Sequence, residues 1–159
     1  MKSLLLVIDM QKAFINKNTE FLIEKINTLV ESEKYNDIVF TRFINTKESL
    51  FVKKLNYYGC IEDDKEIVVK TKKNKVFDKK TYTALNNDLK NYIEKNEIDK
   101  IYLCGIDTAA CVLKTALDLF ENGYDVYVLK EYCASTHGYE RNKNALEILK
   151  RNIGENSII

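Results

Sequence analysis

A chain of 159 residues is long enough to bury a sizeable core, and it is most simply one domain covering residues 1–159. Hydrophobic residues make up 45% of the chain and charged residues 31%, as in ordinary soluble proteins. The formal net charge of +1 gives no broad field that would attract nucleic acid or an anionic membrane, so neither is an expected partner.

The first apolar run ends at Asp9, which makes it too short for a membrane span and unlike a signal peptide, so a cytoplasmic protein is expected. Beyond it, strand-like and helix-like segments alternate, and the periodicity of their apolar residues distinguishes the two. The expected strands are 3–9, 37–43, 65–70, 100–105, 124–129 and a short 156–159, and the expected helices are 19–34, 81–96, 109–122 and 139–152. This alternation predicts a three-layer α/β/α fold with a mainly parallel, six-stranded sheet.

Ligands of such open sheets bind beyond the carboxyl ends of the strands. The residues that follow the expected strands are therefore the candidates for a site. They are Asp9, Arg42 to Asn45, Lys70, Gly105 to Cys111, and Glu131 to Ser135.

Cys111 is the most reactive group among these candidates. If Thr108 caps the following helix, Cys111 lies in its first turn, where free N–H groups and the helix dipole would lower the thiol pKa and could bind an oxyanion. Asp9 could then act as a general base, and Lys70 would keep both groups ionised. Each residue also has a commoner structural explanation, because an Asp often caps a turn and a Cys in an apolar helix usually belongs to the core.

Other sites are not expected. The four cysteines are scattered without a CxxC pair and His137 is the only histidine, so neither a structural zinc nor a disulfide framework is predicted. We interpret His137 as a capping or surface residue and the lysine-rich stretch 70–80 as a solvated loop. The glycine pattern of nucleotide-binding Rossmann proteins is missing.

Several stretches in the right order over nearly the entire chain resemble the isochorismatase-like cysteine hydrolases, a Rossmann-like superfamily that includes nicotinamidases, N-carbamoylsarcosine amidases and ureido-acid hydrolases. The pairing of "VIDMQ" with "GIDTAACV" is the most specific part of this resemblance. The matching stretches are "LLLVIDMQKAF" (4–14), "VFTRFIN" (39–45), "IVVK" (67–70), "CGIDTAACV" (104–112), "TALDLFENGYDVYVL" (115–129) and "CAS" (133–135).

The resemblance implies a catalytic triad of Asp9, Lys70 and Cys111. It also implies a cis peptide before Asp107, with the N–H groups of Asp107 and Cys111 as the oxyanion hole. No cofactor is expected. Because isochorismatase proper lacks the nucleophilic cysteine, Cys111 favours hydrolysis of a C–N bond in a small amide or ureido substrate, through a thioester.

The sequence departs from the family pattern in three places. The stretch after the family's lysine usually reads K-x-x-Y-S-A-F, whereas "KTKKNKVF" follows here, so Lys70, Lys72 and Lys73 compete for the triad position. We favour Lys70 because it ends an apolar strand, and Lys72 stays open. The region after the second strand contains no histidine, so the two-histidine metal site of nicotinamidases is not expected, and Glu131 stands where the family has an Asp after its fifth strand.

The pocket and the assembly are less sharply defined by the sequence. We expect Gln11, Phe14, Phe43 and Asn45, together with the 71–80 loop, to line the substrate pocket. The many aromatic residues and the family resemblance predict a homo-oligomer, a dimer or tetramer. The alternative to an enzyme is a protein of this fold that no longer catalyses and acts as a binding or assembly module.

Overall fold

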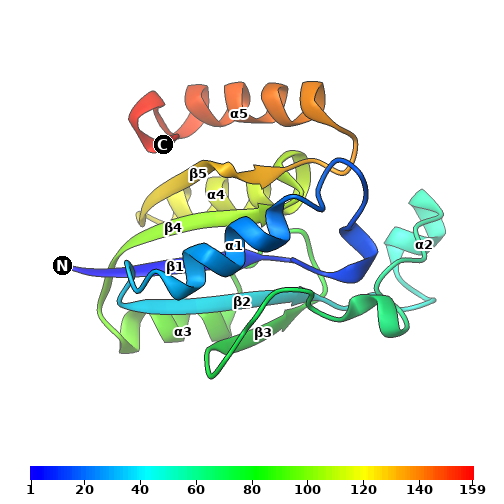
Figure 1. Ribbon diagram of the computed structural model, residues 1–159, viewed down its shortest axis with the longest axis horizontal. Coiled ribbons are helices and arrows are strands. Elements are labelled where there is room, and N and C mark those ends of the chain that lie inside the picture. The colour runs from blue at the N-terminus through cyan, green and yellow to red at the C-terminus, as the bar shows by residue number, and fades with distance from the viewer.

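The computed structural model describes all residues from Met1 to Ile159. Five parallel strands form a single sheet in the order β3-β2-β1-β4-β5, and four of the five α-helices flank it, while α2 stands apart (Figure 1). The strands are β1 Lys2–Ile8, β2 Asp37–Phe43, β3 Lys75–Lys79, β4 Ile98–Ile106 and β5 Asp125–Ala134. The helices are α1 Leu22–Glu31, α2 Leu50–Leu55, α3 Asn87–Lys95, α4 Leu113–Glu121 and α5 Tyr139–Ile153.

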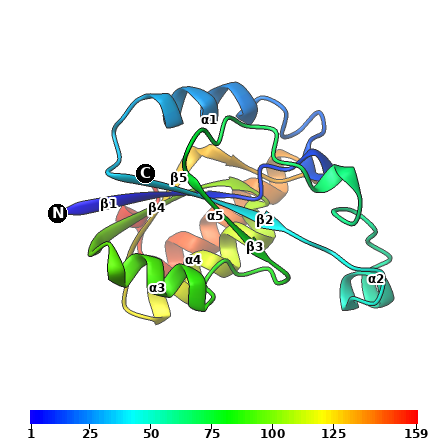
Figure 2. The ribbon, with the colours of Figure 1, turned by 90° about the horizontal axis from the view of Figure 1, so that it is seen from below.

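The helices cover both faces of the sheet, which confirms the predicted three-layer α/β/α fold. Helix α1 lies on one face and α3, α4 and α5 lie on the other (Figure 2). Leu4, Leu6 and Ile8 of β1 belong to the core beneath α3 to α5, whereas Leu5 and Val7 belong to the core beneath α1. Alternate side chains of a strand point to opposite faces, so a strand buried on both sides must be apolar throughout.

The strand order reverses between β1 and β4, which lie side by side at the centre of the sheet. At such a switch point the connections leave in opposite directions and open a crevice beyond the carboxyl ends of the two strands. Gly105 of β4 is paired with Ile8, and a Cβ atom at Gly105 would lie 2.1 Å from the Ile8 carbonyl oxygen. Only glycine permits this close approach, which brings the ends of β1 and β4 together.

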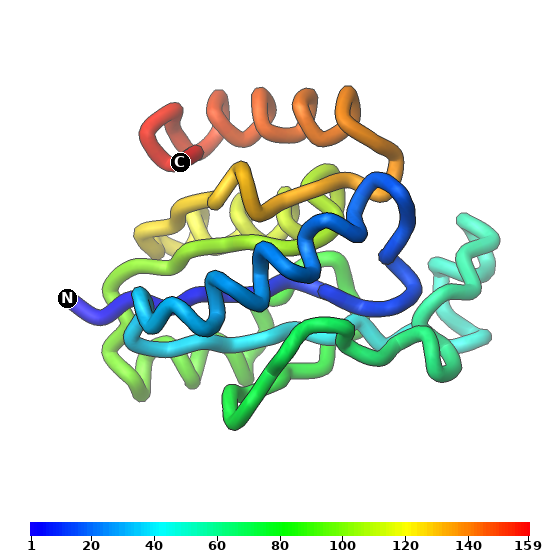
Figure 3. The backbone as a smooth tube through the Cα atoms, in the orientation of Figure 1, coloured from blue at the N-terminus to red at the C-terminus, as the bar shows by residue number.

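The connection from β2 to β3 forms the wall of that crevice. In Figure 3 it runs, from cyan to green, past the carboxyl ends of the strands through α2 and then returns to the edge of the sheet. Both chain termini lie at the opposite end of the molecule (Figure 3). No helix combines the length and apolar character needed to cross a membrane.

Two predicted strands are wrong in detail, so the sheet has five strands and not six. Segment 65–70 does not join the sheet, because it pairs with the residues just beyond β1. The Lys12 N–H donates to the Glu66 carbonyl and the Val68 N–H donates to the Met10 carbonyl, both at 2.9 Å. The third strand is instead Lys75–Lys79. At the C-terminus only Ile158 makes a single bridge, to Val128.

Candidate active site

A buried ion pair lies at the carboxyl end of the central strands. Asp9 follows β1 and is completely buried, and its Oδ2 lies 2.7 Å from the Lys79 Nζ at the end of β3. The Thr41 hydroxyl donates to Asp9 Oδ1 at 2.7 Å, which fixes the orientation of the carboxylate. The Lys79 ammonium also donates to the backbone carbonyls of Thr81 at 2.8 Å and Tyr82 at 3.1 Å.

Cys111 completes the cluster from the other side of the switch point. Lys79 Nζ lies 3.6 Å from Cys111 Sγ, so one ammonium group contacts both the carboxylate and the thiol. The structure thus brings together Asp9 and Cys111, as the sequence predicted, around a different lysine.

Cys111 lies in a π-type turn, Thr108–Val112, that precedes α4. Its cap is Asp107, whose side chain accepts a hydrogen bond from Ala109 N–H at 2.8 Å, and not Thr108 as predicted. The peptide bond between Ile106 and Asp107 is cis, as the family resemblance implied. The turn therefore places the thiol directly beyond β4.

The electrostatic setting of the thiol corrects one expectation. Burial raises the pKa of the Cys111 thiol, the Asp9 carboxylate raises it further, and the Lys79 ammonium opposes both. Burial alone would lower the pKa of Lys79. The contacts with Asp9 and Cys111 raise it by more, so the pKa of Lys79 is raised overall. The net shift of the Cys111 pKa is therefore upward, opposite to the lowering that was expected from the helix.

The placement of Lys70 is also wrong. Lys70 is exposed, and its Nζ lies 3.2 Å from Glu31 of α1, away from Asp9 and Cys111. Lys72, the other candidate, is exposed on the turn before β3. Because segment 65–70 is not a strand of the sheet, its end does not reach the edge where Asp9 and Cys111 emerge.

A signal for Lys79 was present in the sequence. Starting at Lys79, the chain reads "KKTYTAL", which follows the K-x-x-Y-S-A-F pattern except at two positions. Thr83 stands in place of Ser and Leu85 in place of Phe, and both changes are conservative. Strand β3 was hidden because three of its five residues are charged, as is common in an edge strand.

The cluster opens into a cavity of about 760 Å³ whose lining is mainly apolar. Phe14 and Phe43 line it as predicted, and Cys111 lies in its wall. Sequence reasoning missed the contributions of the α2 region and of the turn after β5. The full lining is Ala13, Phe14, Ile15, Asn16, Phe43, Phe51, Leu55, Tyr57, Tyr82, Asp107, Ala110, Cys111, Thr136, His137 and Arg141.

Gln11 and Asn45, which were also expected in the pocket, do not line this cavity. The Gln11 side chain is buried and joins the backbone of Phe43 to that of Lys65, donating to both carbonyls at 2.8 Å. The Asn45 amide donates to the backbone carbonyls of Tyr57 and Gly59 at 3.0 Å. Both residues therefore hold the loops that shape the cavity.

Asp107 and Thr136 together connect three loops at the cavity. The Asp107 Oδ2 accepts hydrogen bonds from Ser135 Oγ at 3.1 Å, Thr136 N–H at 3.0 Å and Thr136 Oγ1 at 2.9 Å, while Oδ1 accepts from Ala109. The Thr136 carbonyl in turn accepts from the Asn16 side chain at 3.0 Å. The loops after β1, β4 and β5 are thus one connected unit around Cys111.

Glu131 does not belong to this unit, because it is exposed within β5 and lies 3.8 Å from Lys25. His137 is exposed, as expected of a surface residue, and lies at the cavity with Nδ1 3.1 Å from the Thr136 hydroxyl; the cap of α5 is Gly138.

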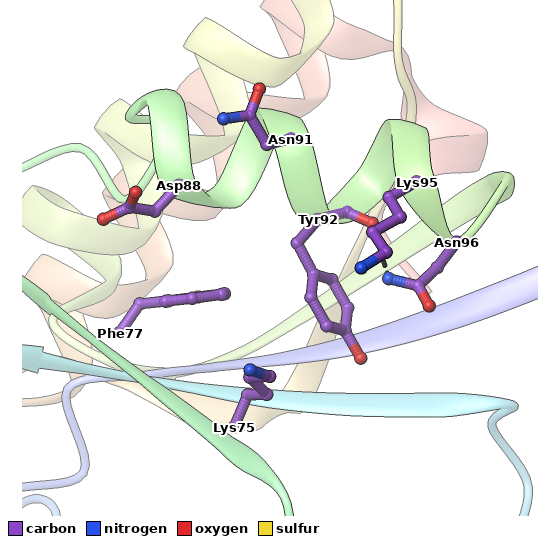
Figure 4. Close-up of a pocket in the computed structure, with 7 residues that line it drawn as sticks. All are labelled: Lys75, Phe77, Asp88, Asn91, Tyr92, Lys95 and Asn96. Atoms are coloured by element: carbon purple, nitrogen blue, oxygen red, sulfur yellow. Dashed lines mark hydrogen bonds between the residues drawn. The ribbon is translucent and has the colours of Figure 1, made fainter.

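A second cavity, of about 330 Å³, lies between β3 and α3 (Figure 4). It contains Lys75 at the start of β3 and Tyr92 of α3, whose hydroxyl donates to Asp37 at 3.0 Å. It lies toward the amino ends of the strands and holds no cysteine or histidine. The cavity at Cys111 is therefore the candidate active site.

Comparisons with known proteins identify the family of this chain. Residues 3–156 match the model of the family described as "Isochorismatase domain". Isochorismatase family protein 1A of Dictyostelium discoideum is 31% identical over 145 residues, which cover 87% of this chain and 66% of that protein. The chain thus spans slightly less than two thirds of that relative's length. The secreted isochorismatase effector Isc1 of Phytophthora sojae is 30% identical over 155 residues, covering 94% of this chain and 69% of that protein.

Solved structures share the fold at lower identity. Pyrazinamidase of Pyrococcus horikoshii, solved in complex with zinc, has a TM-score of 0.85 and 24% identity and covers 99% of this chain and 97% of its own. N-carbamoylsarcosine amidase from Thermoplasma acidophilum has a TM-score of 0.84 and 20% identity, with coverages of 97% and 94%. The family-model match over nearly the whole chain and the curated relatives together establish that this chain belongs to the isochorismatase domain family.

Proposed function

We propose that this protein hydrolyses a C–N bond of a small amide or ureido substrate through a thioester on Cys111. The observation that carries the proposal is the contact of one buried ammonium, that of Lys79, with both the Asp9 carboxylate and the Cys111 thiol at the end of an apolar cavity. Carboxylate, ammonium and thiol within one cluster supply a base, a fixed positive charge and a nucleophile. The proposed triad is Asp9, Lys79 and Cys111.

In the first step Asp9 accepts the thiol proton while Sγ attacks the carbonyl carbon. Because burial raises the pKa of Cys111, little free thiolate accumulates, and proton transfer has to accompany formation of the S–C bond. Lys79 remains charged and stabilises the carboxylate before the transfer and the developing negative charge on sulfur during it.

The tetrahedral intermediate needs donors for its oxyanion. We assign this role to the backbone N–H groups of Asp107 and Cys111, which belong to the same turn as the nucleophile. Asp9 then returns the proton to the departing nitrogen, so that ammonia or an amine leaves and a thioester remains. Water activated by Asp9 hydrolyses the thioester and regenerates the thiol.

No step is derived through a metal ion. Although the Pyrococcus pyrazinamidase was solved with zinc, this chain gathers no group of three or more His, Cys, Asp or Glu side chains that could hold one. The donor set does not fit such a site.

Two structural neighbours, a pyrazinamidase and an N-carbamoylsarcosine amidase, support C–N bond hydrolysis as the reaction class. A departure from the family pattern after Lys70 would favour the alternative of a non-catalytic binding module. The cluster uses Lys79 instead, so that stretch does not argue against catalysis. Four free cysteines fit a reducing compartment, and we place the reaction in the cytoplasm.

The direct test is release of ammonia or amine from a panel of small amides and ureido compounds. Wild-type protein should turn over at least one class of them, and Cys111→Ala should abolish that turnover while keeping the fold. Acyl-enzyme trapped on Cys111 and detected by mass spectrometry would support the thioester. Turnover that survives in Cys111→Ala would refute the proposed mechanism.

We also propose that the protein self-associates. Several large apolar side chains are exposed. Leu50 and Leu55 lie on α2, which stands apart from the sheet (Figure 1), and Tyr58 lies in the loop that follows it. Light scattering should give at least twice the monomer mass at micromolar concentrations, and a monomer mass throughout would contradict it.

A further inference from the structure

Arg141 is the feature of the active-site cavity that the proposed mechanism does not use. The chain contains three arginines. Arg42 pairs with Asp78 at 2.7 Å, and Arg151 lies exposed near the end of α5, outside the cavity. Arg141, in the first turn of α5, is also exposed but lines the cavity, and its side chain forms neither an ion pair nor a hydrogen bond.

The other charged groups at or beside the cavity already have partners within the chain. Asp9 and Lys79 neutralise one another at 2.7 Å. The Asp107 carboxylate accepts four hydrogen bonds, from Ala109, Ser135 and two groups of Thr136, which leave its charge well solvated by the protein. Arg141 is therefore the one permanent charge of this cavity that has no partner within the chain.

Arg141 is exposed, and the cavity that it lines is mainly apolar. Much of the remaining wall is apolar, with Phe14, Phe43, Phe51 and Leu55 among its members. Electrostatic attraction weakens less with distance beside apolar walls than in open water, and a guanidinium can bind a carboxylate through two parallel hydrogen bonds. A cavity of this kind suits a small molecule with an apolar body and an anionic end.

We infer that the substrate carries a carboxylate, which Arg141 binds while the scissile C–N bond lies at Cys111. This inference rests on the proposed function and narrows it from small amides in general to amido or ureido acids. Arg141 is then the residue that makes the enzyme prefer acidic substrates. Cys111, Asp9 and Lys79 hydrolyse the C–N bond whether or not the substrate carries a carboxylate.

The test compares acids with neutral partners of similar shape. Suitable pairs are terephthalamate with para-toluamide, succinamate with butanamide, and N-carbamoylglycine with ethylurea. Ammonia release should give a higher kcat/KM for the acid of at least one pair. Arg141→Gln should reduce the ratio of acid to neutral kcat/KM by about 10- to 100-fold, mainly through KM, which is the scale of a hydrogen bond to a charged group. Arg151→Gln, the matched control on the same helix, should leave the ratio unchanged.

Binding to Cys111→Ala separates this inference from the proposed reaction. By calorimetry, at least one acid should bind more tightly than its neutral partner, and adding Arg141→Gln should remove the difference. If Cys111→Ala shows this preference but wild-type protein releases no ammonia, the reaction is refuted and the acid-binding role stands. Equal binding of acid and neutral partner in every pair, absence of binding by any acid, or a ratio unaffected by Arg141→Gln would overturn the inference.

Discussion

The Lys79 ammonium lies 2.7 Å from the Asp9 carboxylate, and the two side chains are 2% and 0% exposed. A buried pair of this kind costs desolvation energy on both sides, so breaking it leaves an isolated buried charge that is far more costly than the pair. Since the same ammonium reaches the Cys111 thiol at 3.6 Å, the pair couples the stability of the fold to the reactivity of the site.

Replacing Lys79 should therefore impair both properties. We expect Lys79→Gln to lower turnover by about 10²-fold or more, the scale of losing one preorganised electrostatic partner. The free energy of unfolding should fall by about 3–5 kcal/mol because Asp9 is left buried without a countercharge. Urea unfolding and ammonia release per folded molecule would measure the two effects separately.

Lys70→Gln is the matched control. Lys70 forms an exposed pair with Glu31, and such pairs contribute little, so stability should change by less than about 0.5 kcal/mol and turnover should stay at the wild-type level. Loss of activity in Lys70→Gln with normal activity in Lys79→Gln would reverse the assignment.

The comparison of Lys70 with Lys79 shows what the sequence could and could not reveal. Asp9 and Cys111 were predictable because the runs before them are continuously apolar, as strands buried on both faces must be. β3 has no such run because it lies at the sheet edge, whereas 65–70 is apolar because it packs beside the chain after β1. The local pattern of apolar residues indicates that a segment is buried, but burial alone does not reveal whether that segment joins the sheet.

The pocket was predictable only in part, for a related reason. Phe14 and Phe43 follow strands directly, so topology alone places them near the site. Phe51 and Tyr57 come from the long connection between β2 and β3, whose path depends on contacts such as those of Asn45 with Tyr57 and Gly59. Contacts between residues in irregular segments have no periodic signature in a sequence.

The raised pKa of Cys111 leads to a prediction about alkylation. The thiolate is the reactive form, so the rate with iodoacetamide should rise about tenfold per pH unit from pH 7 to 9 without reaching a plateau. Cys111 should still react first, because it lines the cavity whereas Cys60, Cys104 and Cys133 do not. Lys79→Gln should slow the reaction at each pH, because Lys79 is the contact that lowers the pKa. A plateau between pH 6 and 8 would instead indicate a preformed thiolate.

Asp107 should act as a positioning residue for the turn that carries Cys111. Both carboxylate oxygens of Asp107 accept hydrogen bonds, one on Oδ1 and three on Oδ2. In Asp107→Asn one of these oxygens becomes an NH₂ group, so at least one donor then faces another donor whichever way the amide is turned. We expect kcat to fall by about tenfold or more with little change in KM, and unfolding free energy to fall by about 1–3 kcal/mol.

Thr136→Ser is the conservative control for this network, since it keeps both groups that donate to Asp107, and it should retain most of the wild-type kcat. A purely structural role for Asp107 would lower the folded fraction without changing kcat per folded molecule, and that outcome would contradict the prediction.

Stability at alkaline pH follows from the buried thiols. Burial raises the pKa of Cys104, and Cys133 adds to the shift, so in the folded protein the thiol keeps its proton well above its ordinary value of 9.0. The unfolded chain releases that proton from about pH 9, so above this pH the folded state binds more protons than the unfolded state. The free energy of unfolding must then fall as pH rises, by up to about 1.4 kcal/mol per pH unit for each such group.

Cys104→Ala isolates the contribution of this thiol. At pH 7 the variant should be less stable than wild type because it loses buried volume, and the difference should shrink between pH 9 and pH 10.5 because its unfolded state has one proton fewer to release. Urea unfolding at pH 7, 9 and 10.5 measures the trend for both proteins. Parallel pH profiles would show that Cys104 ionises equally in the folded and unfolded states, and would contradict the pKa direction on which the prediction rests.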